Sequence, residues 1–353
     1  MLRFTGIALA LSLALANAQA TEQPASASAS AAISINASVP QQFAALGDFP
    51  LESKNVIQGC KIGYRTLGKL NPAKSNAVVF IPWHTGRSIE ALGLLGPKGL
   101  FNPAPYFVIV IDPIANGVSC SPSNSGRQHG TSFPDFTIRD MVESEYRVLT
   151  EALGLKHVHA IVGYSMGAMQ TFQWMVTHPE FMDVAVPIAG TPQQTSYDML
   201  FWRTEELAIL SDPDYLDGKY AKNPNLELYQ RIFAMNATSP SFRVQNTPPA
   251  AFEKFLQETD EFDPESPDAN DMRWQIRAFL KHDIGANAAK KVKAKVHIIN
   301  SSQDHMVNPA PAIAFGKQIG ASVTVLDSNC GHSGLGCDLD KMRPIVERAL
   351  KGH

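Results

Sequence analysis

The sequence predicts an α/β fold, in which helices cover both faces of a mostly parallel sheet. Three observations lead to this prediction. Short runs typical of buried strands alternate with helical patterns along most of the chain. One long segment, residues 193–290, has helical patterns and no strand-like run. A Gly-x-Ser-x-Gly motif lies between a strand pattern and a helix pattern, at residues 163–167.

The first half of the core begins with an alternating, β-prone segment at residues 55–67. Compact apolar runs predict buried strands at residues 77–81, 107–111, 158–162 and 184–188. Thr137 and Asp140 resemble a capping box, which predicts a helix that runs to about residue 153 and stops at Gly154. A second helix is expected at residues 166–177.

The second half of the core follows the long helical segment. Strands are expected at residues 295–300 and 322–326, with a helix at residues 312–318 between them and a last helix at 340–350. Amphipathic patterns predict helices at residues 197–210, 226–236, 250–259 and 271–281. We therefore divide the chain into a core, residues 46–192 and 291–353, and a helical lid, residues 193–290, over the carboxyl edge of the sheet.

Composition limits the class of protein. Of 353 residues, 44% are hydrophobic and 18% are charged, which is enough apolar material for a large core. Acidic residues outnumber basic ones by 33 to 30, so no basic excess exists to neutralise a nucleic acid. A mean hydropathy of −0.09 excludes a protein with many membrane spans. We expect a slightly acidic globular enzyme or binding protein.

The N-terminus, residues 1–20, has the pattern of a cleaved signal peptide. Arg3 is the only charge before Glu22, an apolar run follows, and residues 18–20 form a small-x-small cleavage pattern. The run is too short to span a bilayer, so we expect a periplasmic or secreted protein without stable membrane insertion. The alternative is a short helix packed on the domain. Residues 21–45 are expected to form a flexible tether rich in alanine and serine.

The Gly-x-Ser-x-Gly motif predicts a nucleophile at Ser165. A serine on a sharp strand-to-helix turn is strained and exposed to substrate, and it needs small neighbours two residues away, here Gly163 and Gly167. The helix that follows directs free N–H groups at the site, so the Met166 amide is a candidate oxyanion donor. Tyr164, inside the motif, is a candidate for the substrate pocket.

A serine nucleophile needs a base, and the base needs an acid that orients it. Asp304 follows one predicted core strand and His332 follows the next, so both are expected at the same sheet edge as Ser165. Two competitors are weaker. His305 adjoins the acid and could not face it, and choosing Asp327 would leave Asp304 without a role.

The second oxyanion donor is expected in the loop after the strand at 77–81, where a backbone amide near His84 is the candidate. Trp83 and His84 either line the acyl pocket or only pack the loop. A metal site would need a cluster of ligands, and His157 with His159 is too little. We expect no metal and no cofactor.

The four cysteines allow three disulfide pairings. A bond between Cys330 and Cys337 would close a short loop around His332 and leave Cys60 and Cys120 as partners or as free thiols. The alternative is that all four are buried as small apolar side chains.

Several motifs together resemble the homoserine O-acetyltransferase family. They lie at residues 70–72, 76–77, 85–86, 133–142 and 163–170. The resemblance implies an α/β-hydrolase fold with a helical lid and a mechanism in which an acyl group is carried on Ser165. It also implies a homodimer formed through the lid.

Two positions depart from that family's pattern. The family has an aspartate after the catalytic histidine, where this chain has Ser333. It also has an arginine six residues before an Asp-Pro pair, where this chain has Glu206; Arg203 lies one helical turn earlier. A zwitterionic amino acid would then bury unpaired charges, so homoserine is not the expected acceptor.

The sequence therefore predicts an exported serine hydrolase whose small-molecule acyl substrate is a carboxylic ester, with a lactone or a thioester as alternatives. The alternative is an O-acyltransferase that uses an alcohol other than homoserine. A third interpretation, a binding protein without catalysis, is weakened by the complete set of catalytic residue types.

Overall fold

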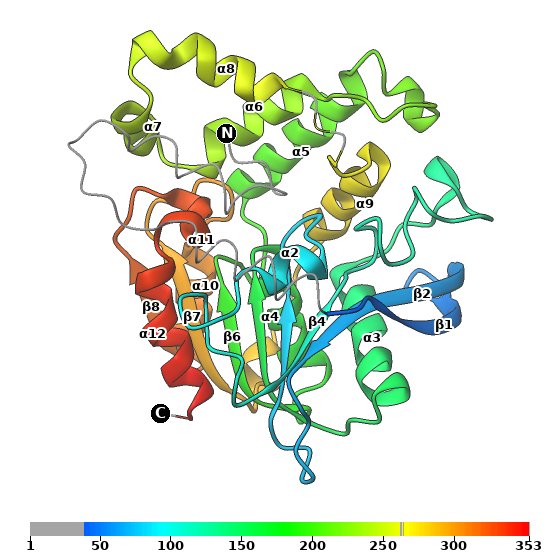
Figure 1. The fold of residues 1–353 in the computed structure, drawn as a ribbon, viewed down its shortest axis with the longest axis vertical. Coiled ribbons are helices and arrows are strands. Elements are labelled where there is room, and N and C mark those ends of the chain that lie inside the picture. The colour runs from blue at the N-terminus through cyan, green and yellow to red at the C-terminus, as the bar shows by residue number, and fades with distance from the viewer. Residues whose placement is uncertain (1–38, 262, 264, 353) are drawn as a thin grey trace.

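The computed structural model describes residues 39–261, 263 and 265–352. The predicted signal peptide and residues 21–38 of the predicted tether lie outside the described residues. The fold is an eight-stranded sheet with helices on both faces and a helical layer above one edge (Figure 1). The predicted α/β fold class is confirmed.

The strands lie in the order β1-β2-β4-β3-β5-β6-β7-β8. β1 and β2 are antiparallel to their neighbours, and β3 to β8 run parallel. The strands are β1 Gln42–Pro50, β2 Val56–Leu67, β3 Ala77–Ile81, β4 Phe107–Ile111, β5 Val158–Tyr164, β6 Met182–Ile188, β7 Lys295–Ser301 and β8 Ser322–Leu326. The central strands are almost wholly buried because helices cover both faces, which explains their continuous apolar runs.

The buried apolar side chains form two clusters, one on each face of the sheet. On one face pack α3 (Ile138–Arg147), α4 (Met166–Thr177) and α10 (Ala310–Gln318). On the other pack α2 (Ser88–Leu92) and α12 (Leu339–Leu350). The predicted cap of α3 is present, because the Thr137 hydroxyl accepts a hydrogen bond from the Asp140 amide while the Asp140 carboxylate accepts one from the Thr137 amide.

A helical insertion leaves the core after β6 and returns before β7. It contains α5 (Ser196–Ser211), α6 (Glu227–Ala237), α7 (Pro240–Asn246), α8 (Phe252–Asp260) and α9 (Ala269–Leu280). α5 to α8 lie above the carboxyl ends of the parallel strands, and α9 lies between them and the core (Figure 1). The sequence patterns missed α7, a short helix that starts with a proline and is capped by Ser239.

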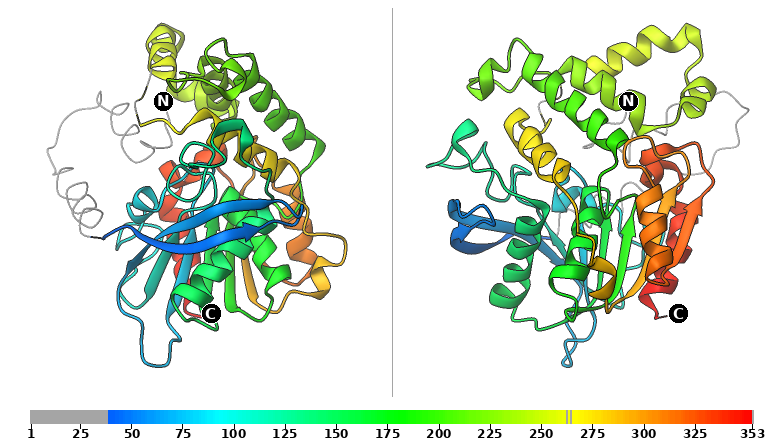
Figure 2. Two further views of the ribbon diagram at one scale, coloured as in Figure 1. Left: turned by 90° about the vertical axis from the view of Figure 1, so that its right-hand side faces the viewer. Right: turned by 180° about the vertical axis from the view of Figure 1, so that it is seen from behind.

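The first strand corrects the predicted end of the tether at residue 45. β1 starts at Gln42 and pairs with β2 along its whole length, and together they cross the outer edge of the parallel strands (Figure 2). Its inward side chains are Ala44, Leu46 and Phe49, with a register shift on each side of Gly47, whose φ is 67°. The bulge breaks the two-residue alternation, so no strand pattern is visible in the sequence.

The four cysteines form two disulfide bonds, including the predicted bond between Cys330 and Cys337. Cys60 on β2 is bonded to Cys120 in the loop after β4, and Cys330 is bonded to Cys337. No helix in the described part of the chain has the length and apolar character needed to cross a membrane.

Candidate active site

Ser165 lies at the turn from β5 into α4, at the carboxyl edge of the sheet. Its φ of 57° and ψ of −117° are strained for a residue with a side chain. The turn is tight on both sides: a Cβ atom on Gly163 would collide with the Gly167 carbonyl, and one on Gly167 would collide with the Ile81 carbonyl. The two glycines therefore allow β5, α4 and the end of β3 to meet at the serine.

Three predicted side chains lie in a hydrogen-bonded line. His332 Nε2 is 2.7 Å from Ser165 Oγ, and His332 Nδ1 is 2.7 Å from Asp304 Oδ2. The other carboxylate oxygen, Asp304 Oδ1, accepts hydrogen bonds from the amides of Met306 (2.9 Å) and Val307 (2.8 Å). All three side chains are buried. This geometry lets the imidazole take a proton from the serine while the carboxylate fixes the ring.

The two competitors lie elsewhere. His305 follows the acid in the chain and is half-buried, whereas Asp327, at the end of β8, is exposed. Neither has a hydrogen bond to Ser165 or His332 among the described residues.

Tyr164 supports the histidine instead of lining a pocket. Its hydroxyl donates a hydrogen bond to the backbone carbonyl of His332, and both side chains are buried. Burial raises the pKa of Tyr164 above its usual value, so the phenol stays protonated and remains a donor. The prediction that Tyr164 belongs to the substrate pocket is corrected, because its polar end is engaged below the site.

The loop that carries His332 is attached to the lid. The Ser333 hydroxyl donates to the carbonyl of Ala237 at the end of α6 (2.8 Å). One turn away, the Asn329 carbonyl accepts from the Ser239 amide (3.2 Å), and the Asn329 side chain donates to Gln245 on α7 (2.8 Å). Ser333 therefore connects the histidine loop to the lid. This placement corrects the prediction that Ser333 lines the substrate pocket.

The two predicted oxyanion donors come from adjacent segments. Met166 is the first residue of α4, and His84 lies in the loop after β3. The Gln275 side chain on α9 holds this loop: its Nε2 donates to the Ile114 carbonyl (2.9 Å), and its Oε1 accepts from the Thr85 amide (2.7 Å) and lies 3.0 Å from His84 Nδ1.

The contact with Gln275 also fixes the state of His84. Because Gln275 Oε1 is an acceptor, His84 Nδ1 must carry the proton and Nε2 the lone pair. Burial lowers the pKa of His84 to about 4, with the hydrogen bond to Gln275 acting in the opposite direction. His84 is therefore neutral at physiological pH. No sequence pattern pointed to Gln275, since it is one polar residue of a lid helix.

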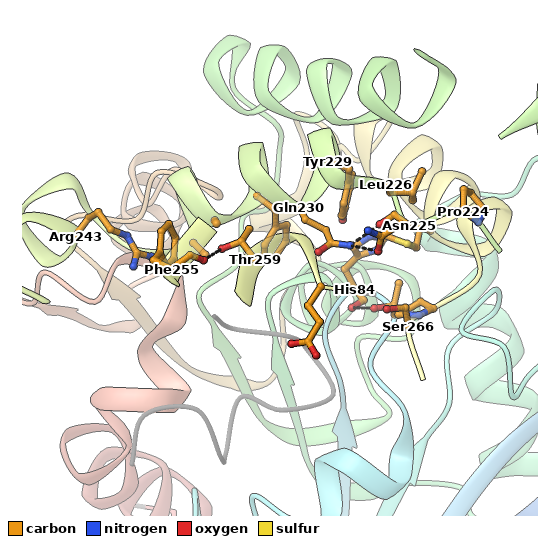
Figure 3. A pocket seen from close by; sticks show the side chains of 17 residues that line it. His84, Pro224, Asn225, Leu226, Tyr229, Gln230, Arg243, Phe255, Thr259 and Ser266 are labelled. Carbon is orange, nitrogen blue, oxygen red and sulfur yellow. Dashed lines mark hydrogen bonds between the residues drawn. The ribbon is translucent and has the colours of Figure 1, made fainter. Parts of the chain in front are cut away.

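A cavity of about 110 Å³ lies between this loop and the lid (Figure 3). His84 and Thr85 form its wall on the core side, and the lid forms the rest. The lid contributes residues 224–226, α6, Arg243 of α7, α8, the start of α9, and the loop residues Glu261, Ser266 and Pro267. Its lining is largely apolar, with side chains that include Leu226, Tyr229, Phe233, Phe255 and Met272. Ala237, whose carbonyl accepts a hydrogen bond from Ser333, also lines the cavity, so one lining residue contacts the loop that carries His332.

Three predicted pocket residues do not line this cavity. Trp83 is buried in the apolar cluster on one face of the sheet. Glu206 lies 3.3 Å from the guanidinium of Arg273 and 3.8 Å from that of Arg203. The Arg203 side chain is 69% exposed. These placements correct the predictions: α5 is rotated so that this pair of charges faces α9 and solvent.

The only described group of three possible metal ligands consists of Cys330, Cys337 and Asp338. Both sulfurs are already joined in a disulfide, so neither can bind a metal as a thiolate. His157 and His159 belong to no such group among the described residues, and His157 Nε2 lies 2.9 Å from a carboxylate oxygen of Asp183 at the surface.

Comparison with known proteins shows the family to which the chain belongs. The model of the alpha/beta hydrolase fold matches residues 98–336. The chain belongs to the α/β-hydrolase family. Within this family, it is 30% identical to a probable esterase of Corynebacterium glutamicum, over 88% of this chain and 95% of the relative. It is also 30% identical to an ethyl acetate hydrolase of Pseudomonas veronii, over 84% of this chain and 90% of the relative.

A solved α/β-hydrolase structure, an acetylester hydrolase from Corynebacterium glutamicum, superposes with a TM-score of 0.77 at 28% identity, covering 89% of this chain and 95% of that one. The homoserine O-acetyltransferase of Caulobacter vibrioides is 36% identical, over 52% of each chain. The predicted resemblance to that family is therefore confirmed, as is the prediction of an α/β-hydrolase that is an esterase or an acyltransferase.

Proposed function

We propose that this α/β-hydrolase is an exported serine esterase that hydrolyses short carboxylic esters through an acyl-enzyme on Ser165. The observation that carries the proposal is the buried line of hydrogen bonds from Ser165 through His332 to Asp304. Such a line turns a hydroxyl into a nucleophile, since it provides both a base and a group that orients the base.

In the first half of the reaction, His332 Nε2 takes the Ser165 proton as Oγ bonds to the ester carbonyl carbon. The amides of Met166 and His84 stabilise the resulting oxyanion. The carbon–oxygen bond to the alcohol then breaks, and His332 returns its proton to the leaving alkoxide. In the second half, His332 deprotonates a water molecule as it attacks the acyl-enzyme carbonyl carbon. The bond from that carbon to Ser165 Oγ then breaks, His332 returns the proton to Oγ, and the carboxylic acid leaves.

The short chain length of the substrate is supported by the cavity and by the relatives. The cavity beside the His84 loop, of about 110 Å³, is of a size that holds a small molecule. One relative is named an ethyl acetate hydrolase and one similar solved structure an acetylester hydrolase, and both names support a short acyl group here.

The second candidate is an O-acyltransferase, favoured by the 36% identity to a homoserine O-acetyltransferase. Homoserine itself is a poor fit. Ser333 is hydrogen-bonded to Ala237, and Glu206 is paired with Arg273, so neither position offers a partner to an amino acid. A transferase would therefore use another alcohol as acceptor.

Export is supported by the two disulfides, which persist in oxidising compartments. The mature N-terminus tests it: N-terminal sequencing of protein from the periplasm or medium is expected to begin at Thr21. We also propose a homodimer formed through the lid, since α5 exposes Leu200, Leu207 and Leu210. Light scattering on the wild type and on Leu207→Glu tests it, and a monomeric wild type would exclude it.

The central experiment is labelling with a fluorophosphonate probe, followed by assays with short-chain acetate esters. Wild-type protein is expected to be labelled and active, Ser165→Ala to be neither, and the exposed control Ser302→Ala to match the wild type. Product analysis with a competing alcohol separates the two candidates: a hydrolase releases free acid, and a transferase passes most of the acyl group to the alcohol. A folded wild type that is neither labelled nor active contradicts both.

A further inference from the structure

Arg243 places a positive charge in the largely apolar cavity. It comes from α7, and its guanidinium lies 3.9 Å from the centre of the Phe255 ring. One nitrogen, Nη1, donates to the hydroxyl of Thr247 (2.9 Å). Arg243 and Phe255 lie together at one end of the labelled side chains, away from His84 (Figure 3). The cavity thus has a neutral polar wall near the core and a cation in the lid.

The charge of Arg243 is not balanced by a carboxylate of the described chain. No ion pair within 4.0 Å joins Arg243 to any described aspartate or glutamate, although Glu261 also lines the cavity. Burial lowers the pKa of the Arg243 guanidinium, yet a guanidinium remains charged at neutral pH. Four of its five N–H donors have no described acceptor, so the guanidinium is available to an anion that enters the cavity.

Two backbone hydrogen bonds connect Arg243 to the loop that carries His332. The Arg243 amide donates to the Ser239 carbonyl (3.2 Å), and the Ser239 amide donates to Asn329, three residues before His332 (3.2 Å). Arg243 is therefore one helical turn, about 6 Å along the axis, from the point where the lid contacts the histidine loop. Arg243 therefore belongs to the lid helix that is hydrogen-bonded to the loop carrying the general base.

We propose that Arg243 is a specificity-determining residue that binds a carboxylate on the substrate, so that the enzyme prefers esters that carry a second, anionic end. The guanidinium would hold the carboxylate through paired hydrogen bonds, while Phe255 and the apolar wall contact the carbon chain between the two ends. The inference rests on the proposed esterase function and adds a substrate class to it.

Two substrate pairs test which side of the ester carries the charge. In the first pair, para-acetoxybenzoate and its methyl ester, the carboxylate is on the leaving alcohol. In the second, phenyl hemisuccinate and methyl phenyl succinate, it is on the acyl group. Release of the phenol is measured in each case. Wild-type kcat/KM is expected to be about tenfold or more higher for the anionic member of at least one pair.

Three variants separate charge recognition from structural damage. Arg243→Gln is expected to remove the preference by slowing the anionic substrate alone, and Arg243→Lys to keep part of it, since ammonium retains charge without the planar fork. Arg231→Gln is the control, because Arg231 is an exposed arginine on α6 that is paired with Asp260 and lies outside the cavity. Equal rates for both members of both pairs in the wild type, or an equal loss for both in Arg243→Gln, would overturn the proposal.

A binding measurement keeps this outcome distinct from the failure of the esterase function. In Ser165→Ala, calorimetry is expected to give tighter binding of para-acetoxybenzoate than of its methyl ester, and Ser165→Ala/Arg243→Gln to lose the difference. This preference can be present even if no ester is hydrolysed. Equal binding of acid and methyl ester by Ser165→Ala would overturn the role of Arg243 while leaving the esterase function to the labelling experiment.

Discussion

Replacing Asp304 by asparagine tests whether its carboxylate sets the protonation of His332. Asp304 Oδ1 accepts two backbone N–H groups, from Met306 and Val307, and Oδ2 accepts from His332 Nδ1. In Asp304→Asn, the amide oxygen must stay with the two N–H donors, because the opposite orientation would leave both unsatisfied in a buried site, at about 1–3 kcal/mol each. The amide NH₂ group then faces His332.

This orientation gives the imidazole the wrong tautomer. An NH₂ group donates, so His332 Nδ1 must carry the lone pair and Nε2 the proton, and Nε2 can no longer accept the proton of Ser165. The same substitution in a serine protease triad lowers kcat about 10⁴-fold, which corresponds to about 5.5 kcal/mol in the activation free energy. We expect a loss of this order here.

The assay is steady-state hydrolysis of a short acetate ester at neutral pH, with thermal unfolding measured on the same samples. The matched control is Asp327→Asn, which makes the same change at an exposed residue at the end of β8. It is expected to retain wild-type kcat. If folded Asp304→Asn kept more than a tenth of wild-type kcat, or if both variants lost activity equally, the assigned role of Asp304 would be wrong.

Three further results are expected. Tyr164→Phe leaves the buried His332 carbonyl without its hydrogen-bond donor. Denaturation should then show a free energy of unfolding lower by about 1–3 kcal/mol, and kinetics should show a fall in kcat that exceeds any change in KM. Unchanged stability and kcat would refute this role. Opening the Cys330–Cys337 bond, by reductant or by a double serine variant, frees a short loop around His332 and should cost about 2–3 kcal/mol of stability together with activity; a fully active double variant would contradict it. Burial lowers the pKa of His282 to about 4, so below pH 6.5 the folded state binds fewer protons than the unfolded state and loses stability as the pH falls toward 4. In denaturant titrations, His282→Gln should reduce this loss by up to about 3 kcal/mol. An unchanged pH dependence would argue against this role of His282.

The residues at strand ends could be predicted because a parallel sheet brings its carboxyl ends to one edge. Ser165, Asp304 and His332 each follow a strand whose apolar run is visible in the sequence, so their meeting needs only the topology. The bounds of α4 agree with the prediction for the same reason, since the motif marks its start. Local pattern and global fold point to the same answer in this part of the chain.

The pocket could not be predicted, because it depends on how helices turn and cross. Arg203 and Glu206 lie on the correct lid helix, but the rotation of α5 is set by Trp202 and Glu205, which face inward. α7 supplies Arg243, yet its seven residues are too few to show an amphipathic period. Gln275 likewise acts through contacts between segments 161 and 190 residues distant in the chain, which no local pattern records.

The hydrogen bonds between the lid and the histidine loop have a mechanical consequence. Ser333 with Ala237, and Asn329 with Ser239 and Gln245, join α6 and α7 to the segment that carries the general base. Any motion that lifts these helices must either break these hydrogen bonds or carry the His332 imidazole away from Ser165. A wide opening of the lid therefore costs either these three hydrogen bonds or the alignment of the proton relay, and a substrate small enough to enter without displacing α6 avoids both costs.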